Sequence, residues 1–223
     1  MRDMQIVLMS PGRSCGLARR WMAVGTLLVA AAACAPTPAP PKVHTIDQQY
    51  LAPADQNIAA DVAACSPGYA PDSIQIAQTF TAGRAGTLDQ VGLNANRIDG
   101  SVPAAAPLGI TIQTVATDGT PSGTVIGSGT YNGPANVGGV LFNMPLSTPA
   151  HVVSGQMYAI VVTQAGCASP GPDNGWTFTG AKAPSDPYAG GVGWVRLVGS
   201  GGTWRTGDRT GQLLDFFFNT WVA

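Results

Sequence analysis

The sequence predicts an all-β protein, an antiparallel β-sandwich or jelly roll of about nine strands. Three observations lead to this class. The chain of 223 residues contains no glutamate and only two lysines, two residue types that favour helices. It contains 29 glycines and 18 prolines, as expected of a chain with many turns. Short segments of alternating apolar and polar residues follow one another between the turns, which is the pattern of strands with one buried face.

The strands follow from this alternation, taken along the chain. In residues 74–80 and 108–114 one set of alternate positions is apolar except for Gln78 and Thr114, and residues 157–162 form a continuous apolar run. Residues 118–123, Asp-Gly-Thr-Pro-Ser-Gly, are a dense turn signal. The expected strands are, in order, 74–80, 88–97, 108–114, 124–131, 139–146, 156–163, 175–179, 191–198 and 213–222.

The segment before the first expected strand is of mixed character. Residues 58–64 are rich in alanine, so they are expected to form one or two helical turns or an irregular segment. Residues 66–71, Ser-Pro-Gly-Tyr-Ala-Pro, then interrupt any regular structure. The sequence shows no repeat of fixed period.

The N-terminus has the organisation of an export signal. Arg13, Arg19 and Arg20 precede an uncharged run, residues 21–33, which is too short to span a bilayer. Residues 1–33 are therefore expected to be a signal peptide. The Arg19–Arg20 pair is also similar to a twin-arginine signal.

The end of the run, Ala31-Ala-Ala-Cys34, resembles a bacterial lipoprotein box, although Ala31 stands where that box usually has leucine. The resemblance implies a chain that begins at Cys34 and is acylated on its thiol. Residues 34–43 would then be a proline-rich tether and residues 44–223 a single β-sandwich domain. The alternative is an ordinary signal-peptidase site, Ala33-Cys34-Ala35, which would release a soluble protein.

The charges and cysteines after Cys34 limit the classes of function. Seven lysines and arginines stand against eleven aspartates, so the net charge of this part is −4, which argues against a nucleic-acid partner. Only Cys65 and Cys167 remain in the folded part of an exported chain. The expected arrangement is a Cys65–Cys167 disulfide, and the alternative is two separate buried thiols.

Six short segments carry a resemblance to a known family. They are residues 77–83 (AQTFTAG), 86–91 (GTLDQV), 119–123 (GTPSG), 155–161 (GQMYAIV), 187–191 (PYAGG) and 215–220 (DFFFNT). In this order they resemble the choice-of-anchor group of bacterial exported β-sandwich domains, over residues 78–222. The resemblance implies a shape similar to carbohydrate-binding modules and a place on surface proteins with differing anchors. It brings neither catalytic residues nor a ligand.

Catalysis is poorly supported by the residues. The two histidines, His44 and His151, lie at the tether and beside an expected turn, and no serine has a Gly-x-Ser-x-Gly surrounding. A glycoside hydrolase would have to use two aspartates, and most aspartates here lie in turns, where aspartate is common in any case.

Binding is better supported, because sugar sites often combine an aromatic ring with polar groups. Trp204 lies in a glycine-rich polar segment with Arg205 and Asp208, and Tyr188 and Trp176 are further aromatic candidates near expected loops. The competing interpretations are structural: Trp204 begins a strand and covers an edge of the sandwich, and Tyr188 packs a turn. Trp194 and the aromatic residues near the C-terminus are expected in the core.

A structural calcium ion is the one cofactor that the sequence leaves open. The aspartates expected in turns are Asp72, Asp89, Asp118, Asp173 and Asp186. They do not form a D-x-D-x-D-G loop, so no metal-binding residue is assigned.

The expected function is binding or display at the cell envelope, without catalysis, with glycans or envelope proteins as partners. The membrane would be reached only through the lipid at Cys34. The first alternative is a structural or adhesion domain with protein partners and no small ligand, and the next is an aspartate-based glycoside hydrolase.

Overall fold

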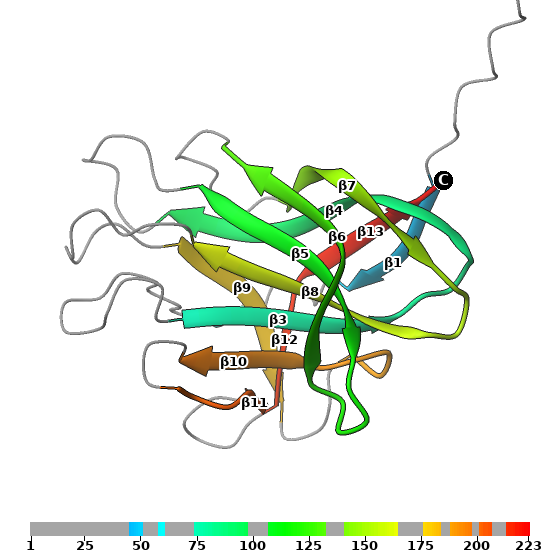
Figure 1. The fold of residues 1–223 in the computed structure, drawn as a ribbon. Coiled ribbons are helices and arrows are strands. Elements are labelled where there is room, and N and C mark those ends of the chain that lie inside the picture. Colours follow the sequence, from blue (N-terminus) through cyan, green and yellow to red (C-terminus); the bar gives the residue numbers. More distant parts are fainter. Residues whose placement is uncertain are drawn as a thin grey trace, which may run out of the picture. The chain divides into compact units, whose positions relative to one another are not determined.

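The computed structural model describes residues 45–50, 58–60, 74–97, 107–132, 141–164, 176–183, 188–197, 201–206 and 213–223. Within these ranges the chain forms thirteen strands and no helix, and every strand pair is antiparallel (Figure 1). The predicted all-β class is therefore confirmed. Among these same residues no helix is long and apolar enough to cross a membrane.

The chain divides into two compact units, Met1–Pro40 and Pro41–Ala223, and all described residues belong to the second. The predicted signal peptide, the lipidation residue Cys34 and the tether over residues 34–43 lie outside the described residues. The same holds for both members of the predicted disulfide, Cys65 and Cys167.

The strands agree closely with the expected segments. Their bounds are β1 Thr45–Tyr50, β2 Ile58–Ala60, β3 Ile74–Thr81, β4 Gly86–Arg97, β5 Leu108–Val115, β6 Pro121–Tyr131, β7 Leu141–Val152, β8 Met157–Gln164, β9 Trp176–Ala183, β10 Gly193–Leu197, β11 Arg205–Thr206, β12 Leu213–Phe216 and β13 Phe218–Val222. Each of the nine expected segments overlaps a strand, although β7 and β9 extend beyond their expected ends, to Val152 and Ala183, and β6 begins at Pro121, inside the expected turn.

The structure differs from the prediction in several places, and two of the differences have a local cause. Residues 58–60 form strand β2 against β9 and not a helical turn, because their backbone groups pair with residues 178–180. The last expected strand is divided at Phe217, whose N–H donates to the carbonyl of Thr179 at 2.9 Å. Strands β1 and β11 lack a clear alternation and are not among the nine expected segments, although the structural interpretation of Trp204 expects a strand to begin there.

The strands follow the order β1-β13-β4-β7-β6-β5-β8-β3-β10-β11, and β9 joins β2, β4 and β12 beside this path. Figure 1 shows the part β5-β8-β3-β10-β11 of this order as successive neighbours. Strands from distant places in this order contribute to one main core. Its members include Phe80, Leu88, Val91, Leu93, Ile110, Ile112, Met144, Ile160, Val162, Phe216 and Phe218. The alternate apolar positions that predicted strands therefore face a common interior.

Strand β3 is buried on both faces, which distinguishes it from a strand with one solvated face. Ile76 and Phe80 enter the main core, as their alternation predicts. Ala77, on the opposite face, is also fully buried and belongs to a second, smaller cluster. We call the side of β3, β8 and β10 that faces away from the main core the outer face.

Gln78 shares the inner face of β3 but is polar, and it is only 1 % exposed. Its side-chain amide donates to Oδ1 of Asp215 at 2.8 Å, and its Oε1 accepts the N–H of Phe216 at 2.7 Å. Oδ2 of Asp215 accepts the N–H of Tyr188 at 3.0 Å. These bonds satisfy buried polar groups and join β3, β12 and the turn before β10.

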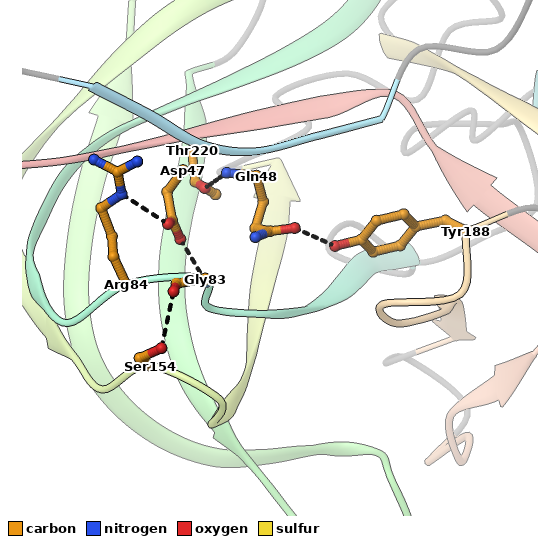
Figure 2. A network of polar contacts seen from close by, with 7 residues as sticks. All are labelled: Asp47, Gln48, Gly83, Arg84, Ser154, Tyr188 and Thr220. Atoms are coloured by element: carbon orange, nitrogen blue, oxygen red, sulfur yellow. Dashed lines mark hydrogen bonds and ion pairs between the residues drawn. The ribbon is translucent and has the colours of Figure 1, made fainter.

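Strand β1 is held on β13 by side-chain bonds as well as by the strand ladder (Figure 2). The side chain of Asp47 accepts the N–H of Gly83 at 3.0 Å and forms an ion pair with Arg84 at 3.3 Å. The Asp47 side chain is 1 % exposed, whereas that of Arg84 is 49 % exposed. The N–H of Gln48 donates to the hydroxyl of Thr220 at 3.0 Å. The first described strand is thereby fixed to the turn after β3.

Candidate functional site

The outer face carries a second apolar cluster beside the main core. Its buried members are Ala77, Ala159, Val161 and Trp194, and half-buried Val115, Val192 and Trp204 pack against them. The cluster arises from the same alternation that builds the main core. In β10, Trp194 is paired with Ala77 of β3, so the two side chains share one face of the sheet.

Trp204 lies at the exposed side of this cluster, directly before β11. It is half-buried, and the guanidinium carbon of Arg196 lies 4.5 Å from the centroid of its ring. This is a cation–π contact, worth about 0.5–1 kcal/mol at an exposed site. Trp204 thus precedes a strand and packs against an apolar cluster, as the structural interpretation expects, while part of it stays exposed.

A row of polar side chains crosses three adjacent strands next to Trp204. Nε of Arg196 on β10 donates to Oε1 of Gln75 on β3 at 2.6 Å. Nε2 of Gln75 donates to the hydroxyl of Thr163 on β8 at 2.9 Å. The register explains the row, because Gln75 is the pairing partner of both Arg196 and Thr163. All three residues are half-buried.

We define the outer-face site as Trp204, Arg196, Gln75 and Thr163. The side chains come from β3, β8, β10 and the residue before β11, so three of the four stand on paired strands. A row fixed by its own hydrogen bonds loses little further conformational entropy when a ligand binds.

Trp194 lies beside this site, on the same face of β10 as Arg196. It is 8 % exposed, and its Nε1 has no hydrogen-bond partner among the described residues. A Cβ built on Gly119 would lie 3.7 Å from its ring, so the turn between β5 and β6 lies against the indole. Gly119 has a φ of 86°, a left-handed conformation that favours glycine in this turn. Trp194 is buried, as the sequence indicated.

Arg205 does not join Trp204 as expected. Arg205 is paired with Val195, and the neighbouring pair is Thr206 with Trp194. Because side chains alternate along a strand, Arg205 shares the face of Val195, opposite to the face of Trp194. The arginine beside Trp204 is Arg196. Asp208, the other predicted polar partner, lies outside the described residues.

The two remaining aromatic candidates lie on the core side. Trp176 is 2 % exposed and packs edge-on against Tyr131 at 6.1 Å between ring centroids. Tyr188 packs edge-on against Phe218 at 5.2 Å, and its hydroxyl donates to Oε1 of Gln48 at 3.2 Å (Figure 2). Tyr188 thus packs a turn, as the competing interpretation held. Neither ring belongs to the outer-face site, and buried Trp176 offers no surface to a sugar ring.

Two of the aspartates considered for calcium lie among the described residues, on different elements. Asp89 lies half-buried on β4, and Asp118 lies in the β5–β6 turn, where its Oδ1 accepts the hydroxyl of Thr120 at 2.7 Å and the N–H of Thr120 at 3.0 Å. The side-chain bond is the main reason that the pKa of Asp118 lies below its usual range. Within the described ranges no three His, Cys, Asp or Glu residues form a group that could hold a metal. The other three aspartates named above, Asp72, Asp173 and Asp186, lie outside the described residues.

Sequence reasoning did not identify Arg196, Gln75 or Thr163 as site residues. A signal was present in the alternation, since Trp194 and Arg196 are two positions apart in one strand and must share a face. What the alternation did not contain is the pairing of β10 with β3, which brings Gln75 beside Arg196.

Comparison with known protein families finds no family that matches the chain, and no curated protein matches it.

Proposed function

We propose that this protein is an exported β-sandwich domain that acts by binding glycans, without catalysis, through the outer-face site. The sandwich interpretation is supported by the main core, to which strands far apart in the strand order of the sheet contribute. The observation that carries the function is the hydrogen-bonded row of Arg196, Gln75 and Thr163 beside half-exposed Trp204.

The chemistry of this face suits a sugar. Sugars offer hydroxyl groups that both donate and accept hydrogen bonds, together with apolar C–H surfaces. Gln75 and Thr163 each contain donor and acceptor atoms, and Arg196 contributes several donors. Trp204 provides the apolar surface. Sites for small molecules or sugars usually combine an aromatic surface with a small number of polar groups in fixed positions.

The proposal includes attachment to a membrane by a lipid on Cys34, and its support is the apolar run 21–33 that ends at this cysteine. Mass spectrometry of the mature N-terminus tests it. An acylated chain that begins at Cys34 is the expected result. An unmodified chain that begins at Pro36 contradicts the anchor and leaves the binding function untouched.

Glycan binding is tested with the Trp204→Ala variant on a glycan array, followed by calorimetry with the best ligand. We expect binding to weaken by roughly thirtyfold, because truncating an aromatic side chain at the centre of a binding site costs about 2 kcal/mol. Trp221→Ala is the matched control, since Trp221 is also half-buried but lies on β13, far from β11 in the strand order.

Equal binding by the Trp204→Ala variant and the wild type contradicts the site. If the wild type binds no glycan and instead crosslinks to envelope proteins, the glycan proposal is wrong and a structural or adhesion function takes its place.

A further inference from the structure

We infer that the outer-face site binds acidic sugar polymers, with Arg196 in contact with the anionic group of the ligand. This inference rests on the proposed function and adds the chemical class of the glycan. It follows from how Arg196 is held and from what its guanidinium group lacks.

Arg196 is fixed in place from two sides. Gln75 accepts its Nε–H at 2.6 Å, and the ring of Trp204 lies 4.5 Å from its guanidinium carbon. Gln75 is itself held by Thr163 at 2.9 Å. A guanidinium group fixed in this way presents its two terminal nitrogens in one orientation, and this fork matches the two oxygens of a carboxylate.

The charge of Arg196 is not neutralised within the described part of the chain. Among the described residues it forms no ion pair, and its one hydrogen bond uses Nε. Arg84 offers the contrast, since it is more exposed and still pairs with Asp47. Asp118 lies in the turn that packs against Trp194. Its carboxylate accepts hydrogen bonds from Thr120.

Trp204 therefore has a different role from a simple platform for a sugar ring. One face of its indole is covered by the guanidinium group, and the ring also packs against the second cluster. Its position suits it to orient Arg196 and to keep water from one side of it, which strengthens a charge-assisted hydrogen bond to the ligand. The part of Trp204 that remains exposed is available to the sugar.

The attraction is local to this face. The chain after Cys34 has a net charge of −4, so the domain as a whole does not attract polyanions. Preference for an acidic polymer would depend on one arginine and not on a broad basic surface. Replacement of that arginine should therefore remove the preference.

The test measures binding of the mature protein to three polymers by affinity electrophoresis and calorimetry at low and moderate salt. The polymers are polygalacturonate, a sulfated galactan and a neutral glucan. We expect the anionic polymers to bind at least about tenfold more tightly than the neutral one, with an affinity that falls as salt rises. Tighter binding of polygalacturonate would indicate a carboxylate ligand, and tighter binding of the sulfated galactan would indicate a sulfate ligand.

Arg196→Gln should lose the preference for anionic polymers, and Arg196→Lys should recover part of it. Arg205→Gln is the matched control, because Arg205 is exposed on the opposite face of β11 and should bind as the wild type does. Circular dichroism and thermal unfolding establish that each variant is folded.

Equal affinity for neutral and anionic polymers, unchanged in Arg196→Gln, overturns this inference and leaves glycan binding standing. Loss of the preference in Arg205→Gln but not in Arg196→Gln overturns it as well. Failure of the wild type to bind any of the polymers or any glycan on the array contradicts the proposed function itself.

Discussion

The buried bonds of Gln78 allow a quantitative test of how the fold is held together. Gln78→Leu keeps a side chain of similar length but removes the donor to Asp215 and the acceptor for the N–H of Phe216. Both partners are at most 1 % exposed, so water cannot replace Gln78 without opening the interior. Each buried hydrogen bond lost from such a group costs about 1–3 kcal/mol.

The two losses together should lower the free energy of unfolding by about 4 kcal/mol, a large part of the 5–15 kcal/mol typical of a domain. For a domain of this size the melting temperature should fall by roughly 8–16 °C. Urea unfolding followed by tryptophan fluorescence measures the change. The midpoint should move while the slope with denaturant stays the same, because the surface exposed on unfolding is unchanged.

Gln75→Leu is the matched control, since Gln75 is a glutamine on the same strand whose side chain lies on the outer face. Its partners Arg196 and Thr163 are half-buried and can bond to water instead. The cost should stay below about 1 kcal/mol. Stability within about 0.5 kcal/mol of the wild type for Gln78→Leu, or an equal loss in both variants, would refute the argument from burial.

Two further perturbations test side-chain bonds at β1 and in the β5–β6 turn. Asp47→Ala removes the acceptor of the Gly83 N–H and the partner of Arg84. Hydrogen exchange of the β1 amides should become faster, and the free energy of unfolding should fall by about 1–2 kcal/mol. Unchanged exchange in β1 would contradict the role of this side chain. Thr120→Ala removes the main cause of the low pKa of Asp118, so that pKa should rise in an NMR titration of the carboxyl group, and an unchanged value would be evidence against the bond. In the wild type the bond stabilises the fold above the ordinary pKa of aspartate, and this contribution is lost as pH falls through the lowered pKa.

The strands could be predicted from the sequence because alternation is a local property. Ile76 and Phe80 show it in β3, and Ile110 and Ile112 show it in β5. Strand β2 could not be predicted in the same way. Residues 58–60 are one isoleucine and two alanines, which suit a helical turn equally well, and only pairing with β9 makes them a strand.

The site was predictable in part for a similar reason. Trp204 was identified from its polar, glycine-rich surroundings, and it does lie at a partly exposed position. Its neighbours were sought in the adjacent residues of the chain, Arg205 among them. Pairing of strands, however, decides which side chains meet across a sheet, and the order β8-β3-β10-β11 is set by contacts distant in the sequence.

The outer face also explains why Ala77 on β3 and Ala159 and Val161 on β8 stand where a solvated sheet would carry polar residues. Ala77 and Ala159 are small enough to be covered entirely, and Trp194 is paired with Ala77 across the strands. Two positions further along, the same alternation replaces apolar residues by Arg196 on β10 and its partner Gln75 on β3. The boundary between a buried patch and a polar row therefore falls where Trp204 lies, since it contacts the second cluster on one side and Arg196 on the other. An indole at such a boundary is held by the buried side and can orient a charge on the exposed side, and this is the geometry on which the proposed acidic-ligand site depends.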